Sequence, residues 1–224
     1  MRGKARTYRV LVYGDGPHEL LHEWNELLAH GDLPALACLV DRLIDGRGHI
    51  QYEMRLFRQS RHTRGKGLGN EKKTITAMFA AKQLGFDGMV ILIDRDRKPR
   101  SETSDALVRG RDAVGPAGCP CAVGAAVEAF DAWMIIDGRA VQQAGGENAR
   151  CHGDPEKLQG KEGTGQHPKD WAASLFGSKR GLGQKYAIIA RHVDLDMLKK
   201  RCPEGFEPFA REVEQQIRPL FATS

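Results

Sequence analysis

The sequence predicts an α/β protein with a mostly parallel sheet, flanked by helices and followed by a helical C-terminal extension. Three observations lead to this prediction. Through the first 142 residues, short apolar runs alternate with segments of helical periodicity, as in sheets of parallel strands. The run "GMVILID" (88–94) is apolar almost throughout, which is typical of a strand covered on both faces. The last part, 168–224, has helical periodicity alone.

The elements of the first part follow in order. Residues 8–13, "YRVLVY", predict the first strand, and Pro17 suits the first turn of a helix, where a missing N–H needs no partner. Apolar and polar residues alternate over 49–57, "HIQYEMRLF", which predicts a half-buried strand near a sheet edge. The other expected elements are helices over about 33–44, 71–84 and 104–114, and strands over 88–94 and 121–128.

The second part is predicted to be helical around one long loop. An apolar helix is expected in "AFDAWMIIDGRAV" (129–141), and three more in 169–176, 184–202 and 206–221. Residues 143–167 are rich in glycine and polar residues, which predicts a loop. The expected organisation is an α/β domain over 1–142, this loop over 143–167, and helices over 168–224 that pack on the same domain.

Composition narrows the class of protein. The chain has 224 residues, 28% of them charged, and a net charge of +5. It has no apolar run near the ~20 residues needed to span a membrane, and its N-terminus lacks the apolar region of a signal peptide. These features predict a cytoplasmic protein without a membrane partner. They leave its oligomeric state open.

Positive charge is concentrated in two segments that could bind a polyanion. They are "RLFRQSRHTRGKGLGN" (55–70) and "DRDRKPR" (94–100). The alternative is that both are solvated loops, since charge runs alone are usually that. The residues expected to bind nucleic acid are Arg58, Arg61, Arg64, Lys66, Arg97 and Lys98.

The segment His18-Glu19-Leu20-Leu21-His22 matches the H-E-x-x-H pattern of zinc proteases. The extended form of that pattern needs a third histidine at position 28, which is Leu28. On a helix, His18 and His22 lie roughly opposite the apolar face, so another wall would have to cover them. Two histidines on a solvated helix face are therefore the favoured interpretation, with a zinc protease as the alternative.

Acidic residues follow two of the expected strands. Asp15 follows the first strand, and Asp94 and Asp96 end the most apolar one. Ligands of open α/β sheets bind at the carboxyl ends of the strands, so these acids are expected to meet there. In a strand, residues two apart point to the same face, so the D-x-D spacing places the side chains of Asp94 and Asp96 on one side. Three close carboxylates need a cation, and oxygen ligands select Mg²⁺ or Mn²⁺. Glu19 can reach the same place or the start of its helix. The alternative is that the acids are caps and turn residues.

Two groups of motifs resemble known proteins. "VYGDGPHE" followed by "VILIDRDR" resembles the Toprim domain of primases, topoisomerases and OLD-type nucleases, in which an acid-Gly turn and a later D-x-D form a divalent-metal site. "VGAAVEAFDAWMIID" and "YAIIARHVDLDMLKKRCPEGFEPFAREV" resemble a family of uncharacterised prokaryotic Toprim-like proteins. Several of these are encoded beside ABC-type ATPases and are linked to phage defence. The resemblance covers most of the chain.

The resemblance implies roles for individual residues. Asp15 occupies the place of the Toprim turn glutamate, and Asp94 and Asp96 fall on the D-x-D. Glu128 and Asp131 fall on a second acidic pair of the narrower family, whose role is unknown. The turn acid is normally glutamate, and the shorter aspartate withdraws the carboxylate from the site, which affects catalysis more than metal binding.

The expected function is divalent-metal-dependent phosphodiester chemistry on nucleic acid by a nuclease, in a prokaryotic defence system with an ATPase partner. The expected catalytic residues are Asp15, Glu19, Asp94 and Asp96, of which Asp15, Asp94 and Asp96 hold Mg²⁺ or Mn²⁺. A rival of another class is a catalytically silent nucleic-acid-binding or adaptor subunit of an ATPase complex, which the shorter acid at position 15 favours.

Overall fold

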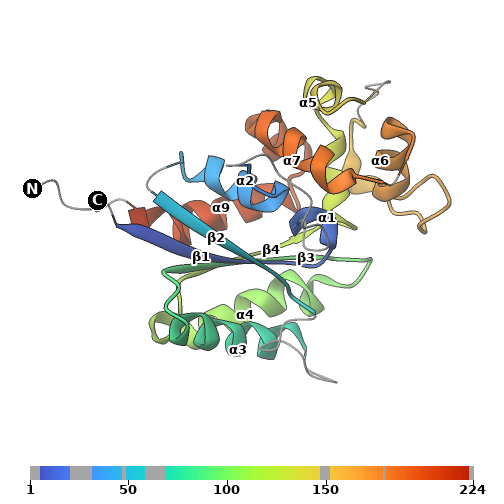
Figure 1. Cartoon of the computed structure of the whole chain (residues 1–224). Helices are drawn as coiled ribbons and strands as arrows, with labels where there is room; N and C mark the ends of the chain where they lie inside the picture. Colours follow the sequence, from blue (N-terminus) through green and yellow to red (C-terminus); the bar gives the residue numbers. More distant parts are fainter. Residues whose placement is uncertain are drawn as a thin grey trace, which may run out of the picture.

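A computed structural model of the chain describes residues 6–20, 32–46, 49–58, 69–146, 152–178 and 180–221. Within them, four parallel strands form one sheet in the order β2-β1-β3-β4. Helices lie on both faces of this sheet (Figure 1). The predicted α/β class with a parallel sheet and C-terminal helices is confirmed.

The strands and helices have the following bounds. The strands are β1 (Thr7–Gly14), β2 (His49–Leu56), β3 (Gly88–Asp94) and β4 (Cys121–Ala126). The helices before the last strand are α1 (Pro17–Leu20), α2 (Ala35–Leu43), α3 (Asn70–Gln83) and α4 (Ser104–Val114). Those after it are α5 (Gly138–Gln143), α6 (Pro168–Phe176), α7 (Leu182–His192), α8 (Leu195–Arg201) and α9 (Phe206–Gln216). Short 3₁₀ segments lie at Arg100–Glu102, Gly115–Ala117, Phe130–Ile135, Pro155–Lys157 and Arg218–Phe221.

The strand order creates a switch point at the centre of the sheet. From β1 the chain crosses to β2 on one side, and it then returns to place β3 on the other side of β1. In open α/β sheets, the crevice beyond the carboxyl ends of two such strands is where ligands bind. The residues that follow β1 and β3 therefore have the position expected of a functional site.

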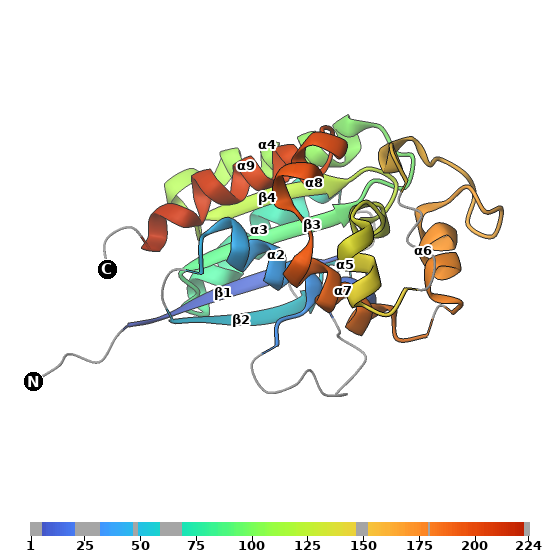
Figure 2. The same cartoon turned by 90° about the horizontal axis from the view of Figure 1, so that it is seen from above.

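Two apolar cores lie on opposite faces of the sheet. One face packs against α3 and α4, with Leu11, Ile91 and Val123 pointing toward them. The other face packs against α2, α7 and α9, which lie above the sheet in Figure 1 and across it in Figure 2. Alternate strand residues such as Val10 and Leu92 point to this second side. Because both faces are covered, β3 is buried at every position, as its apolar sequence predicts.

The edge strand β2 also agrees with its sequence pattern. Ile50, Tyr52, Met54 and Leu56 pack against the core on the α2 side, as alternation predicts. Gln51 is exposed on the other side. The strand pairs with β1 alone within the described residues, which confirms the predicted edge position.

Two predicted helices are divided, and in both cases an aspartate caps the second piece. The segment 129–141 forms a buried 3₁₀ segment and then α5, because the Asp137 carboxylate accepts the N–H groups of Arg139 and Ala140. The segment 184–202 is divided between α7 and α8, where the Asp194 carboxylate accepts the N–H groups of Asp196 and Met197. Apolar periodicity continues through both breaks, so it did not reveal them.

The C-terminal helices cover the same sheet. Helix α9 lies over β4, where a Cβ on Gly124 would be 2.7 Å from Cδ2 of Phe209. The rings of Phe206 and Phe209 pack on Trp133, with centroids 5.1 and 5.6 Å away. In the part of the chain described here, no helix has the length and apolar character that crossing a membrane requires.

Candidate functional site

The turn after β1 is shaped by a close approach between Gly14 and Glu19. The Glu19 carboxylate is buried and accepts the Asp15 N–H through Oε2, at 3.1 Å. A Cβ on Gly14 would lie 2.5 Å from that oxygen, so a side chain there would displace Glu19. Pro17 begins α1, as expected for a residue without an N–H. Glu19 thus lies at the start of its helix and holds the backbone of the turn.

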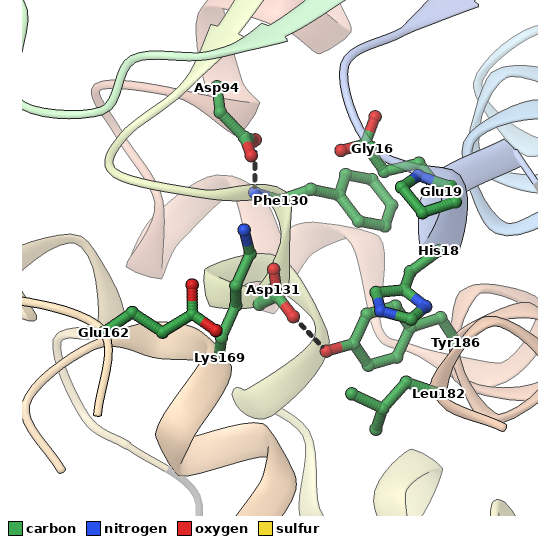
Figure 3. A pocket seen from close by; sticks show the side chains of 11 residues that line it. Gly16, His18, Glu19, Asp94, Phe130, Asp131, Glu162, Lys169, Leu182 and Tyr186 are labelled. Carbon is green, nitrogen blue, oxygen red and sulfur yellow. Dashed lines mark hydrogen bonds between the residues drawn. The ribbon is translucent and has the colours of Figure 1, made fainter. Parts of the chain in front are cut away.

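Asp15 and Asp94 meet at the switch point. Oδ2 of Asp15 accepts the Asp94 N–H at 3.3 Å, and the Asp15 side chain is 5% exposed. Oδ1 of Asp94 accepts the Phe130 N–H at 2.8 Å (Figure 3). Oδ1 of Asp15 is buried and has no hydrogen-bond partner among the described residues. A buried carboxylate oxygen without a donor is costly and is a typical feature of a site that binds a cation.

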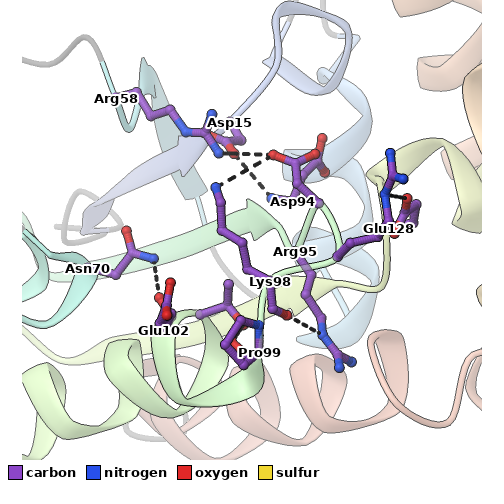
Figure 4. Close-up of polar contacts among 12 residues, drawn as sticks. Asp15, Arg58, Asn70, Asp94, Arg95, Lys98, Pro99, Glu102 and Glu128 are labelled. Atoms are coloured by element: carbon purple, nitrogen blue, oxygen red, sulfur yellow. Dashed lines mark hydrogen bonds and ion pairs between the residues drawn. The ribbon is translucent and has the colours of Figure 1, made fainter. Parts of the chain in front are cut away.

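One arginine bridges Asp15 to Asp96. Nη2 of Arg58 lies 2.7 Å from Oδ2 of Asp15 (Figure 4). The same nitrogen lies 3.2 Å from Oδ2 of Asp96. Lys98 is near the same Asp96 oxygen, with Nζ at 3.9 Å. These contacts bring together Asp15, Asp94 and Asp96, the three acids that the sequence singled out.

Strand alternation does not explain the D-x-D spacing of Asp94 and Asp96, so that prediction is wrong. Strand β3 ends at Asp94, and Asp96 lies in the following turn with a φ of 48°, in the left-handed region. Strand alternation therefore does not orient Asp96. Asp94 is buried, whereas the Asp96 side chain is 42% exposed and faces Arg58 at the rim of the site.

A cavity lies beside Asp94, and Arg58 is not among the residues that line it. It has a volume of about 170 Å³ and lies among the start of α1, the 3₁₀ segment after β4, α6 and α7 (Figure 3). Its lining includes Glu19, Asp94, Phe130, Asp131, Lys169 and Tyr186. With Glu162 from the loop before α6, the cavity therefore joins residues from six separate segments of the chain at the end of β3.

The floor of the cavity is a buried polar pair with a lysine beside it. The Tyr186 hydroxyl donates to Oδ1 of Asp131, and both side chains are buried. Lys169, at the start of α6, points toward Asp94 and Asp131 (Figure 3). Burial opposes the charge of this lysine, but Asp131 and Asp94 raise its pKa above the ordinary value.

Burial and mutual repulsion raise the pKa of three acids of the site, Asp15, Glu19 and Asp94. Burial, followed by the charges of Asp131 and Asp15, raises the pKa of Asp94 to about 8. Burial also raises the pKa of Glu19 well above its usual range, with Asp94 and Asp15 adding to the effect. The pKa of Asp15 is raised by burial, against the opposing charge of Arg58. Strongly shifted acids in a cleft are typical of functional sites.

The histidine pattern has a different environment from the one expected. His18 is half-buried and lines the cavity, with its ring centroid 6.2 Å from that of Tyr186. The prediction of a solvated helix face is therefore wrong for His18, because α7 covers it. His22 lies outside the described residues. The carboxylate of Glu19, the acid of this pattern, accepts a hydrogen bond from the Asp15 N–H in the turn after β1.

The expected nucleic-acid-binding residues are placed only in part. Arg58, Arg97 and Lys98 lie around the outer rim of the site, with side chains 50%, 55% and 47% exposed. Arg61, Arg64 and Lys66 lie outside the described residues. The placed cations therefore surround the acids on the solvent side.

Glu128 and Asp131, the acidic pair of the resemblance, do not share a site. Asp131 faces the cavity beside Tyr186, while Glu128 is buried near Arg97, whose Nε lies 3.1 Å from Oε1. Glu128 has a φ of 62°, so its backbone is turned at the end of β4. The two acids have separate environments and separate partners.

Sequence reasoning missed Lys169 and Tyr186. Each reaches the site from a C-terminal helix far along the chain, so spacing to the acids carried no signal. One cue was available: Tyr186 carries a polar hydroxyl on the helix face that it shares with the apolar residues Ile189 and Ala190. A buried tyrosine hydroxyl requires a partner, and Asp131 provides it.

Comparison of this chain with protein-family models, curated proteins and solved structures finds no match. Among the residues that the structure describes, no three His, Cys, Asp or Glu side chains are preassembled as a metal-binding group.

Proposed function

We propose that this protein is a Toprim-like, divalent-metal-dependent nuclease, with Asp15, Asp94 and Asp96 holding Mg²⁺ or Mn²⁺. The resemblance of its acid motifs to the Toprim domain suggests this chemistry. The observation that supports it most directly is the position of the Arg58 Nη2 atom, between the carboxylates of Asp15 and Asp96.

Nη2 of Arg58 is a guide to where a metal would bind. The position between the two carboxylates already attracts a cationic group, at 2.7 and 3.2 Å from an oxygen of each. The buried Oδ1 of Asp15, which no donor satisfies among the described residues, provides a further oxygen ligand. Hard oxygen donors are the ligands that Mg²⁺ and Mn²⁺ prefer, so the residues present fit such an ion.

The surrounding residues suit a phosphodiester substrate. A bound divalent cation would supply electrostatic stabilisation of the oxygens around the reacting phosphorus. Arg58, Arg97 and Lys98 would bind the anionic backbone from the solvent side, since their side chains are about half exposed. Glu19 would keep the Asp15 turn in place through its bond to the Asp15 N–H.

Cleavage assays on supercoiled plasmid, single-stranded DNA and RNA test this proposal. With Mg²⁺ or Mn²⁺ the protein should cleave at least one of them, and EDTA should abolish the activity. Asp94→Asn should reduce the rate by about a hundredfold or more, because it removes a ligand. Asp105→Asn is the matched control, since Asp105 is a half-exposed acid whose neighbour is Arg100 at 3.7 Å. Equal activity of Asp94→Asn and the wild type would refute the proposal.

A second candidate is a catalytically silent nucleic-acid-binding or adaptor subunit of an ATPase complex in phage defence. The same Arg58 contacts favour it, because an arginine that neutralises Asp15 and Asp96 permanently would leave no place for a metal. The shorter acid at position 15 agrees with this alternative. It predicts salt-dependent DNA binding that Asp94→Asn leaves intact, without turnover under any metal.

A further inference from the structure

A second hollow lies beyond the end of β4, next to the rim of the candidate metal site. It has a volume of about 120 Å³ and is lined by Arg95, Arg97, Val127, Glu128 and Gln159. Two of the five lining residues are arginines from the turn after β3, which also contains Asp96. A third lining residue, Glu128, is acidic, so the hollow is adjacent to the acids of the site and its lining has a net positive charge.

The backbone around this hollow is held in an uncommon conformation. Asp96, Arg97 and Glu128 have φ values of 48°, 59° and 62°. All three lie in the left-handed region, which residues other than glycine rarely adopt. The Asp96 N–H donates to the Glu128 C=O at 3.2 Å, and the Arg95 N–H donates to the Ala126 C=O at 2.9 Å. Backbone strain of this kind is concentrated at functional sites, where the surrounding structure maintains it.

The buried Glu128 side chain contacts Arg97. Its carboxylate is 3% exposed, and Oε1 lies 3.1 Å from Nε of Arg97. The geometry of that contact is not that of a hydrogen bond, so Oε1 is without a donor among the described residues. The Arg97 side chain is 55% exposed. Glu128 therefore fixes one side of a guanidinium group whose remainder is open to solvent.

Arg95 is fixed in a similar way. Its Nε donates to the Lys98 C=O at 3.0 Å, and its Nη1 is 3.5 Å from Oε2 of Glu204. Figure 4 shows this contact with Lys98 and places Glu128 on the neighbouring segment. Both arginines thus line one small hollow, and contacts within the protein hold each of their side chains.

We propose that this hollow binds a phosphate group of the nucleic-acid backbone, beside the phosphate that the Asp15 and Asp94 site would hold. This inference rests on the proposed function, since it assumes a nucleic-acid substrate. Guanidinium groups bind phosphate through parallel N–H donors, and a preformed orientation reduces the entropy lost on binding. Arg95 and Arg97 contact the phosphate, and Glu128 is a positioning residue that orients Arg97.

Binding of a fluorescent duplex or single-stranded oligonucleotide in EDTA tests the subsite without cleavage. Arg97→Ala should weaken binding about tenfold, as expected for one lost charge-assisted contact. It should also reduce the slope of log K against log salt by about 0.9 on a duplex. Arg218→Ala is the control, because Arg218 pairs with Asp45 near the start of β1, at the other end of the sheet.

The sign of the Glu128→Gln effect tests the positioning role. Removing a negative charge near DNA should strengthen binding if charge alone matters. If Glu128 orients Arg97, the substitution should weaken binding at least threefold at an unchanged unfolding midpoint. Glu102→Gln, in an exposed acid of the same turn region, should not weaken it. Tighter binding by Glu128→Gln, or wild-type affinity and slope for Arg97→Ala, would overturn the proposal.

The two proposals fail in different ways. If cleavage requires Asp94 but Arg97→Ala binds the oligonucleotide as the wild type does, the subsite is refuted and the nuclease proposal is supported. Binding that needs Arg97 and Glu128, without cleavage under any metal, would support the subsite and refute the nuclease. Competition by inorganic phosphate or a mononucleotide as strong as that by an oligonucleotide would show a pocket for free phosphate and overturn the backbone assignment.

Discussion

The amide of Asp94 donates a hydrogen bond to the carboxylate of Asp15, 79 residues earlier in the chain, at 3.3 Å. This contact joins the ends of β1 and β3 across the switch point of the sheet. It also brings two buried acids together, so the charge state of one affects the other.

The stability of the metal-free protein should fall as the pH rises from about 5 toward 8. Asp94 has a folded-state pKa of about 8, whereas an unfolded aspartate has a pKa of about 3.9. Between these values the folded state retains a proton that the unfolded state has released, so the slope is about 1.4 kcal/mol per pH unit for one proton. Asp94→Asn should flatten this dependence. Urea unfolding in EDTA at several pH values measures the free energy of unfolding of both proteins. The same dependence on pH for the wild type and Asp94→Asn would contradict the prediction.

Arg58→Ala should increase the affinity for Mn²⁺ by roughly three- to tenfold. The substitution removes a competing cation from the oxygens of Asp15 and Asp96, and the half-exposed position of Arg58 limits the effect. The same variant should bind DNA more weakly, because it loses a cation at the rim. Calorimetric titration with Mn²⁺ measures the first effect, with Arg218→Ala as control. Unchanged or weaker Mn²⁺ binding would mean that Arg58 does not occupy the metal position.

Tyr186→Phe should lower the free energy of unfolding by about 1–3 kcal/mol. The substitution leaves the buried Asp131 carboxyl without its hydroxyl donor, and an unsatisfied buried acceptor has a cost of this size. Denaturant unfolding of both single variants and of the Asp131→Asn/Tyr186→Phe double variant gives the coupling energy. Independent, additive effects would show that the hydrogen bond contributes nothing measurable.

Gly205→Ala should destabilise the protein by about 1–3 kcal/mol through overpacking. A Cβ at this position would lie 2.8 Å from Oε1 of Glu156 and 3.2 Å from the Ala125 carbonyl oxygen. That Glu156 carboxylate accepts the N–H groups of Glu204 and Gly205. Gly153→Ala, where no atom lies within 4 Å of the added carbon, is the control. Equal thermal unfolding of the two variants would contradict this prediction.

The sheet could be predicted from the sequence because its signals are local. The apolar run over 88–94 indicates a strand buried on both faces, and the alternation over 49–57 indicates a strand buried on one face. The structure confirms both. The helix breaks at Asp137 and Asp194 were missed, since a capping aspartate within an apolar periodic segment also suits a helix. Capping was decided there by tertiary contacts, such as the Asp194 N–H that donates to Asp137.

The site was predictable only where its residues follow strands. Asp15 and Asp94 were found because parallel strands end at one edge of a sheet. Lys169 and Tyr186 depend on how the C-terminal helices pack over that edge, which periodicity does not specify. The left-handed backbone of Arg97 and Glu128 has no signal in residue type, because neither is glycine or asparagine.

The packing of α9 on β4 and Trp133 has a consequence for synthesis of the protein in the cell. Trp133 is fully buried, with the rings of Phe206 and Phe209 against it. Until the ribosome has released residues 206–216, this tryptophan and the apolar face around it remain exposed to water. Such nascent chains attract chaperones and aggregate readily. A message cut short before codon 206 should therefore give a chain that cellular proteases remove.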